Sequence, residues 1–292
     1  MKPTRGFTLV ELVIVIALSA IVLVMITVVL KRPLDAYVDQ SRRGELVELA
    51  SLALNRAARD IRLAVPNSVR QSADGRTLEM LNILNAGRYV SNRAGSDSLR
   101  FSAELSGCET ANGRCDGFQV LDPNFDVSGA RWLVVYNLGA SSGGNPSAGA
   151  NVWAYANPGV ITPTGASFTA AANATSRETQ VSLNGLSAAG FTFAYPSPQR
   201  RFYLADQVIG YRCEPAAEGG QLARYTRTTL TATAPSTLPA DAVRVAPYVT
   251  GCQINYQPGT PQRPGLVTLS LTLTREGESI TLQQQVKVDN AP

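Results

Sequence analysis

The chain of 292 residues contains no histidine, and this absence excludes several kinds of chemistry at once. A Ser-His-Asp triad, a Cys-His pair and a histidine metal site all need an imidazole. The sequence also lacks a Walker loop, an HExxH sequence and a dinucleotide fingerprint. We therefore predict a protein that is not an enzyme and that needs no cofactor.

Charge is scarce as well. Charged residues make up 16 % of the chain, and 26 Lys and Arg against 22 Asp and Glu give a net charge of +4. So small a charge does not favour nucleic-acid binding, and no nucleic-acid partner is predicted. Hydrophobic residues make up 45 %, which together with the length allows a sizeable folded core.

One stretch near the N-terminus lacks glycine, proline and nearly all charge. Residues 7–30 form a run of 24 residues whose one charged side chain is Glu11. Such a run is long and apolar enough for a transmembrane helix. Because Lys2 and Arg5 precede it, the positive-inside rule places the N-terminus in the cytoplasm and the rest of the chain outside.

Three interpretations of this run compete. A secretory signal peptide cut after residues 17–20 would leave ten apolar residues at the new N-terminus. A simple single-pass anchor explains the length but not Glu11, since an acidic group in a membrane helix costs up to about 3 kcal/mol. Cleavage between Gly6 and Phe7 would instead create an α-amino cation one turn before Glu11. This amine, or that of a neighbouring subunit, would stabilise the carboxylate in a medium of low dielectric.

Residues 6–11, Gly-Phe-Thr-Leu-Val-Glu, follow a short basic leader and begin the apolar run. They resemble the class III signal of type IV pilins and type II secretion pseudopilins, over about the first 30 residues. The resemblance implies that a membrane-embedded prepilin peptidase cleaves after Gly6 and methylates the amine of Phe7. It also implies that Glu11 sets the register between packed subunits.

Residues 31–65 predict an amphipathic continuation of this helix. The segment has a single glycine, Gly44, and its apolar residues recur at three- and four-residue spacings. Pro33 should kink the rod without ending it, and Pro66 should stop it, because the residue before a proline is disfavoured in the α region. The stripe predicted to be buried consists of Val38, Leu46, Leu49, Leu52, Ala53, Ala57 and Ile61.

The remaining residues, 66–292, predict a β-rich head, and hence an α+β fold in which a long N-terminal helix packs on a mostly antiparallel sheet. The clearest signal is a hairpin of two alternating strands around residues 276–279. Residues 139–176 are rich in small polar residues and predict long surface loops around one short strand. Whether the head has one sheet or two stays open. Other strand candidates begin at Ser98, Ala130, Asn151, Glu178, Gly190 and Arg201.

Four cysteines suit an oxidising compartment and allow three pairings. Cys108 and Cys115 flank a turn-like hexapeptide, which favours a local bridge and leaves Cys213 for Cys252. The second bridge would stabilise the fold by roughly 3–4 kcal/mol. A zinc site is the alternative, but the ligand spacing is wrong and all four thiolates would be needed.

A calcium loop is the other candidate metal site. Asp122, Asn124 and Asp126 offer oxygens at alternate positions, as a calcium loop would. The glycine and terminal glutamate of an EF-hand are missing, so a plain Asp-Pro-Asn turn is favoured. No metal site is predicted.

The domain organisation follows from these segments: a leader (1–6), a transmembrane helix (7–30), a spine helix (31–65) and a periplasmic or extracellular head (66–292). Residues 58–70, 76–90 and 286–292 resemble the MshO-type proteins of MSHA pilus biogenesis.

Together with the length, this resemblance implies a minor pilin that initiates or caps a type IV pilus. It would begin in the inner membrane and end in the fibre at the cell surface. Its partners would be the prepilin peptidase, other major and minor pilins and the inner-membrane assembly platform. A J-type pseudopilin of type II secretion and a tip-located binding or adhesion module are the alternatives.

Overall fold

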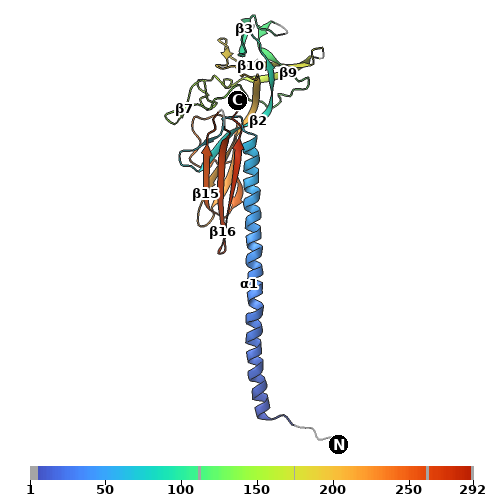
Figure 1. Ribbon diagram of the computed structural model, residues 1–292, viewed down its shortest axis with the longest axis vertical. Coiled ribbons are helices and arrows are strands. Elements are labelled where there is room, and N and C mark those ends of the chain that lie inside the picture. The colour runs from blue at the N-terminus through green and yellow to red at the C-terminus, as the bar shows by residue number, and fades with distance from the viewer. Residues whose placement is uncertain (1–5, 111–112, 174, 261–262, 291–292) are drawn as a thin grey trace.

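The computed structural model describes residues 6–110, 113–173, 175–260 and 263–290. One helix, α1 (Leu9–Arg62), forms its long axis, and the head packs against the C-terminal part of that helix (Figure 1). The predicted α+β class, a long N-terminal helix with a mostly antiparallel β head, is confirmed.

The helix continues through Pro33. Proline removes one backbone donor, and its ring crowds the preceding turn, which is why a kink was expected. The ribbon of α1 nevertheless follows one rod along its length, without a pronounced bend (Figure 1). The apolar and amphipathic segments therefore form one element.

The C-terminal part of α1 buries one face against the head. Among the helix side chains that the structure describes, the first that is buried is Leu46, and the buried positions then recur at short intervals through Ile61. The predicted stripe was wrong at Leu52, which is 61 % exposed, and at Val38, which is also exposed. At about 100° per residue, both positions point away from the face that Leu46 and Ile61 share. The buried positions are Leu46, Ala50, Ala53, Leu54, Ala57, Ala58 and Ile61.

Ion pairs bind the stretch of α1 just before this buried face to the C-terminal hairpin of the head. Arg43 pairs with Glu278 at 2.8 Å, Glu45 with Arg275 at 2.9 Å, and Arg42 with Glu276. These pairs are largely exposed, so each contributes less than about 1 kcal/mol, and they align the helix more than they stabilise it.

The described part of the head contains one large sheet and three small ones, and all of their strand pairings are antiparallel. The large sheet has the order β14-β13-β12-β2-β5-β10-β9, with β1 on β2 and β6 on β12; the small sheets are β11-β3-β4, β15-β16-β17 and β7-β8. The bounds are β1 (Arg70–Gln71), β2 (Thr77–Val90), β3 (Arg100–Ser106), β4 (Arg114–Cys115), β5 (Gly117–Val120), β6 (Trp132–Val134), β7 (Ser141–Ser142), β8 (Asn145–Pro146), β9 (Ser167–Asn173), β10 (Glu178–Asn184), β11 (Phe191–Thr192), β12 (Arg201–Glu214), β13 (Gln221–Arg227), β14 (Val243–Pro247), β15 (Val249–Gln257), β16 (Gly265–Arg275) and β17 (Glu278–Val288).

Most of the predicted strands are present, and one is absent. The hairpin β16–β17 turns at Glu276 and Gly277, which both have positive φ, as a two-residue hairpin loop of the primed type requires. The strand expected from Asn151 is absent: these residues form turns that bury Val152 and Trp153. The apolar run at residues 152–156 does indicate burial, but here loops supply it, so the prediction of surface loops was also wrong for this part.

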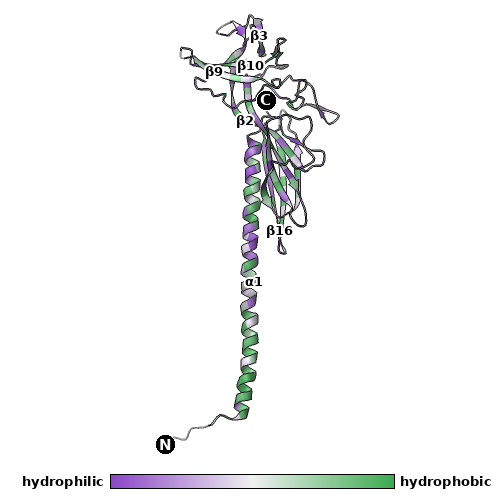
Figure 2. Cartoon of the chain, turned by 180° about the vertical axis from the view of Figure 1, so that it is seen from behind, coloured by the Kyte–Doolittle hydropathy of each residue, from purple (hydrophilic) through white to green (hydrophobic). Residues whose placement is uncertain are grey.

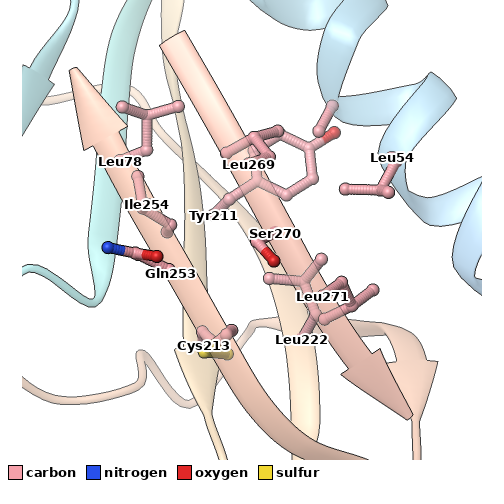
Figure 3. Close-up of a pocket in the computed structure, with 12 residues that line it drawn as sticks. Leu54, Leu78, Tyr211, Cys213, Leu222, Gln253, Ile254, Leu269, Ser270 and Leu271 are labelled. Carbon is pink, nitrogen blue, oxygen red and sulfur yellow. A yellow bond between two sulfur atoms is a disulfide. The ribbon is translucent and has the colours of Figure 1, made fainter. Parts of the chain in front are cut away.

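The core beside α1 lies between the large sheet and the β15–β16–β17 sheet. It joins Ala57 of the helix to Tyr211 of β12 and Leu271 of β16. Leu54 reaches from α1 toward these strands, beside a cavity of about 20 Å³ (Figure 3). That space is close to the size of one water molecule and its lining is mainly apolar, so this core is tightly packed rather than a ligand site.

Two disulfides fasten the head. Cys213 of β12 is bonded to Cys252 of β15, which joins the large sheet to the sheet that packs on α1. Cys108 is bonded to Cys115 and closes the loop between β3 and β4. Among the described residues no cysteine is free, and no group of three or more Cys, Asp or Glu could hold a metal ion.

Candidate assembly site

The N-terminus of α1 is built by a cap that the sequence encodes locally. Thr8 is the N-cap residue, in extended conformation, and its hydroxyl accepts a hydrogen bond from the backbone N–H of Glu11 at 3.3 Å. The spacing Thr-x-x-Glu is that of a capping box, a signal that would have identified Thr8 from sequence alone. Gly6 and Phe7 precede the helix and are exposed. A cut after Gly6 would leave Phe7 as the one residue before the cap.

The cap fixes where Glu11 lies. It is in the first turn of α1, four residues after Phe7. Its side chain is exposed, and within the described residues no basic side chain forms an ion pair with it. The positive end of the helix dipole favours a carboxylate here and disfavours a second cation. An α-ammonium group at Phe7 therefore needs an acidic partner, and Glu11 is the acidic residue in this turn.

The helix around Glu11 is otherwise apolar and uncovered. The segment from Leu9 to Thr27 is long and apolar enough to span a membrane (Figure 2). None of its residues is buried against the rest of the chain. Figure 2 shows this half of α1 extending well away from the head. Apolar surface of this extent needs lipid or the helices of other subunits around it.

The comparison with known proteins bears on this same segment. Residues 1–27 match the family model described as the prokaryotic N-terminal methylation motif. The chain carries a pilin-type N-terminus. No match is found among curated proteins or among solved structures. The motif supports a type IV pilin-like or pseudopilin protein, and it implies processing by a prepilin peptidase and assembly with other pilins.

The candidate calcium site around Asp122 has the geometry of two turns. The carboxylate of Asp122 accepts the N–H of Asn124 at 2.9 Å. That of Asp126 accepts the N–H and the hydroxyl of Ser128, which lower the pKa of Asp126. These bonds are those of local Asx turns, as the turn interpretation predicts.

Sequence reasoning missed a buried charge cluster in the head. Glu79 of β2 has no exposed surface. Its carboxylate accepts a hydrogen bond from Arg70 at 2.6 Å and another from the Tyr225 hydroxyl at 2.8 Å, and it also pairs with Arg227. Burial, together with the charge of Glu79, raises the pKa of Tyr225. The guanidinium of Arg70 stacks 3.6 Å from the centre of the Trp153 ring. The available sequence signal for this cluster was Glu79 itself, an acidic residue inside the otherwise apolar run at residues 78–81.

Proposed function

We propose that this chain is a minor pilin of an MSHA-like type IV pilus. In this proposal it is cleaved after Gly6, methylated at Phe7 and packed with other pilins to initiate or cap the fibre. The observation that carries the proposal is Glu11, a carboxylate with no ion-pair partner among the described residues, in the first turn of an uncovered apolar helix that begins just after the cleavage site. A membrane anchor alone gives this carboxylate no purpose.

The proposed mechanism is charge pairing in a medium of low dielectric. In the membrane, Glu11 lies near the end of the apolar run, where its cost is smaller than at the centre. In a bundle of helices, the methylated amine of Phe7 and a Glu11 carboxylate come together away from water. An unpaired charge there is costly, and a pair satisfies both groups. The carboxylate thereby selects the axial position at which two subunits fit.

The rest of the molecule supports a role in assembly. The buried stripe and the ion pairs fix the head at one end of α1, so that the helix and the head move as one unit. The segment from Leu9 to Thr27 is not covered by the head and is available to other helices. A head of this size suits an end of the fibre better than its repeating body, since it projects far beyond the width of α1 (Figure 1).

The proposal predicts that Gly6→Val blocks processing. A peptidase that takes a helix N-terminus at the membrane interface needs a small residue at the cut, so the full-length precursor should accumulate in the membrane. Gly44→Val is the matched control, because a side chain meets nothing within 4 Å at either glycine. Intact mass separates the forms: the control should lose residues 1–6 and the Gly6 variant should keep them. Normal cleavage of the Gly6 variant would contradict the proposal.

A binding module at the fibre tip is the second candidate, and one feature of the head favours it. A cleft of about 750 Å³ runs beside the β7–β8 hairpin, with Asn67, Gly139 and Trp153 in its lining. Ser147 donates a backbone hydrogen bond to Ala140 at 2.9 Å, so the hairpin between them can be replaced by a short turn without parting its ends.

The two candidates differ in what this replacement removes. Deleting all of residues 139–176 would also remove buried Trp153 and unfold the head, so the change is confined to residues 141–146. A tip-binding module predicts normal numbers of fibres that no longer attach to surfaces. A purely structural minor pilin predicts that both fibre number and attachment stay unchanged.

A J-type pseudopilin of type II secretion remains the third candidate, since it would use the same leader and spine. Deletion of the gene separates the systems: loss of pili with normal secretion supports the pilus. Loss of secreted enzymes with normal pili supports the pseudopilus.

A further inference from the structure

The two edges of the large sheet are very different. At one end, β14 carries Arg244 and Pro247, pairs with β13 through an irregular register, and lies beside α1. Charge, proline and irregular pairing are the devices that protect a sheet edge from pairing with another chain. At the other end, β9 has none of them: its seven residues, Ser-Phe-Thr-Ala-Ala-Ala-Asn, contain no charge and no proline.

The hydrogen bonds of β10 show which backbone groups of β9 are free. Leu183 of β10 donates to Asp116 on the β5 side, so alternate residues of β10 face β5 and those between them face β9. The register of β9 on β10 then directs the N–H and C=O groups of three β9 residues toward the open edge. These residues are Phe168, Ala170 and Ala172.

The inner face of β9, on the side of the sheet where the β10 side chains are buried, is only partly covered. Ala170 lies opposite Val181, which is fully buried, and Ala172 lies opposite Thr179, yet both alanines are exposed. Phe168, on the same face, is only partly buried, against a hydrophobic cluster that includes side chains of β5 and β10. The large sheet therefore ends at β9 while part of this face is still exposed to solvent.

We propose that β9 is a strand-addition site that takes the β9 strand of a second copy of this chain. Antiparallel pairing about a twofold axis at Ala170 sets Ala170 against itself and Phe168 against Ala172 of the other copy. Each of these pairs exchanges two backbone hydrogen bonds. On the inner face a large side chain meets a small one, and no charge is buried anywhere along the seven residues. β9 is complementary to itself, whereas β14 is not.

The position of β9 allows this pairing independently of the contacts that α1 makes. The β9–β10 hairpin lies at the end of the molecule far from the N-terminus and extends to one side of the head (Figure 1). A subunit can therefore pair through β9 while α1 packs in a membrane or a fibre. The inference does not depend on the proposed function and holds equally for a pilin or a pseudopilin.

Disulfide trapping on the full-length chain, purified in detergent without reductant, tests the register. In the proposed dimer the two Ala170 Cα atoms are about 5.5 Å apart, within disulfide range. Ala170→Cys should therefore give several-fold more covalent dimer than the matched control Ala171→Cys. In the control, the two cysteines are diagonal neighbours about 7–8 Å apart. Both variants replace an exposed alanine on the same strand.

A second variant keeps the fold and removes the pairing. The N–H of Ala172 points to the open edge, so Ala172→Pro removes no bond to β10. Added to Ala170→Cys, it should lower the dimer yield to the level of the Ala171→Cys control while the unfolding temperature of the monomer stays the same. Equal trapping at 170 and 171, or trapping that survives Ala172→Pro, would overturn the proposal. If the Ala170→Cys variant crosslinks in cells to a different pilin, without a homodimer, the proposal is overturned as well.

Discussion

The Glu11→Val variant should enter the membrane normally and fail to join the fibre. Replacing a carboxylate by an apolar side chain makes insertion of α1 easier by up to a few kcal/mol. Cleavage after Gly6 should continue, because the apolar run remains and the scissile bond is five residues away. The amine at Phe7 stays cationic near neutral pH, since an α-amino group has a pKa of about 8.

The expected loss is in association. In a bundle of apolar helices, a buried charge without its partner costs on the order of 3–5 kcal/mol, which lowers an association constant by more than about a hundredfold. Processing, membrane fraction and copurification with other pilins are measured together. Glu48→Val is the matched control: Glu48 is exposed on α1 beyond the apolar run, so this variant should process and copurify normally. If Glu11→Val also copurifies like the wild type, Glu11 does not set the register.

The Glu79→Gln variant should destabilise the head strongly. Its carboxylate is fully buried between Arg70 and Arg227, and the amide leaves both guanidinium groups without a counter-charge. Removing one partner of a buried ion pair costs about 3–5 kcal/mol. Arg70 also donates to the carbonyl groups of Thr231 and Ala232, so the loop after β13 should loosen together with the sheet.

Denaturant unfolding followed by tryptophan fluorescence measures this effect. Both tryptophans, Trp132 and Trp153, are buried in the head, so the signal reports the head and not the membrane helix. Glu214→Gln is the control: this carboxylate is more exposed and pairs with Arg212 at 3.4 Å, so its loss should cost less than about 1 kcal/mol. A Glu79 variant as stable as this control would contradict a stabilising role for the cluster.

The parts of the molecule that were predictable from sequence are those whose signals are local. A long apolar run, a run of helix-forming residues and a Gly-containing hairpin each produce their element with little help from the rest of the chain, as α1 and β16–β17 show. The Thr8 cap and Glu11 belong to this class, because four residues define their geometry.

The rest depends on contacts between residues far apart in the sequence. Trp153 is buried by loops and by the guanidinium of Arg70. No periodicity in the sequence near Asn151 predicts either of these contacts. Leu52 looks like a stripe residue by spacing from Leu49, but the helix buries the face centred on Ala57. Pairing of Glu79 with Arg227 joins β2 to β13, and only the folded sheet brings them together. The open edge at β9 follows from strand order, which residue patterns do not reveal.

The N-terminal residue of the wild-type protein, isolated from membranes and read by peptide mass and sequencing, tests the central claim most directly. The account predicts that the chain begins at Phe7 and carries one methyl group on its α-amine. A chain that begins at Met1, or one that begins after Ala20, would contradict it.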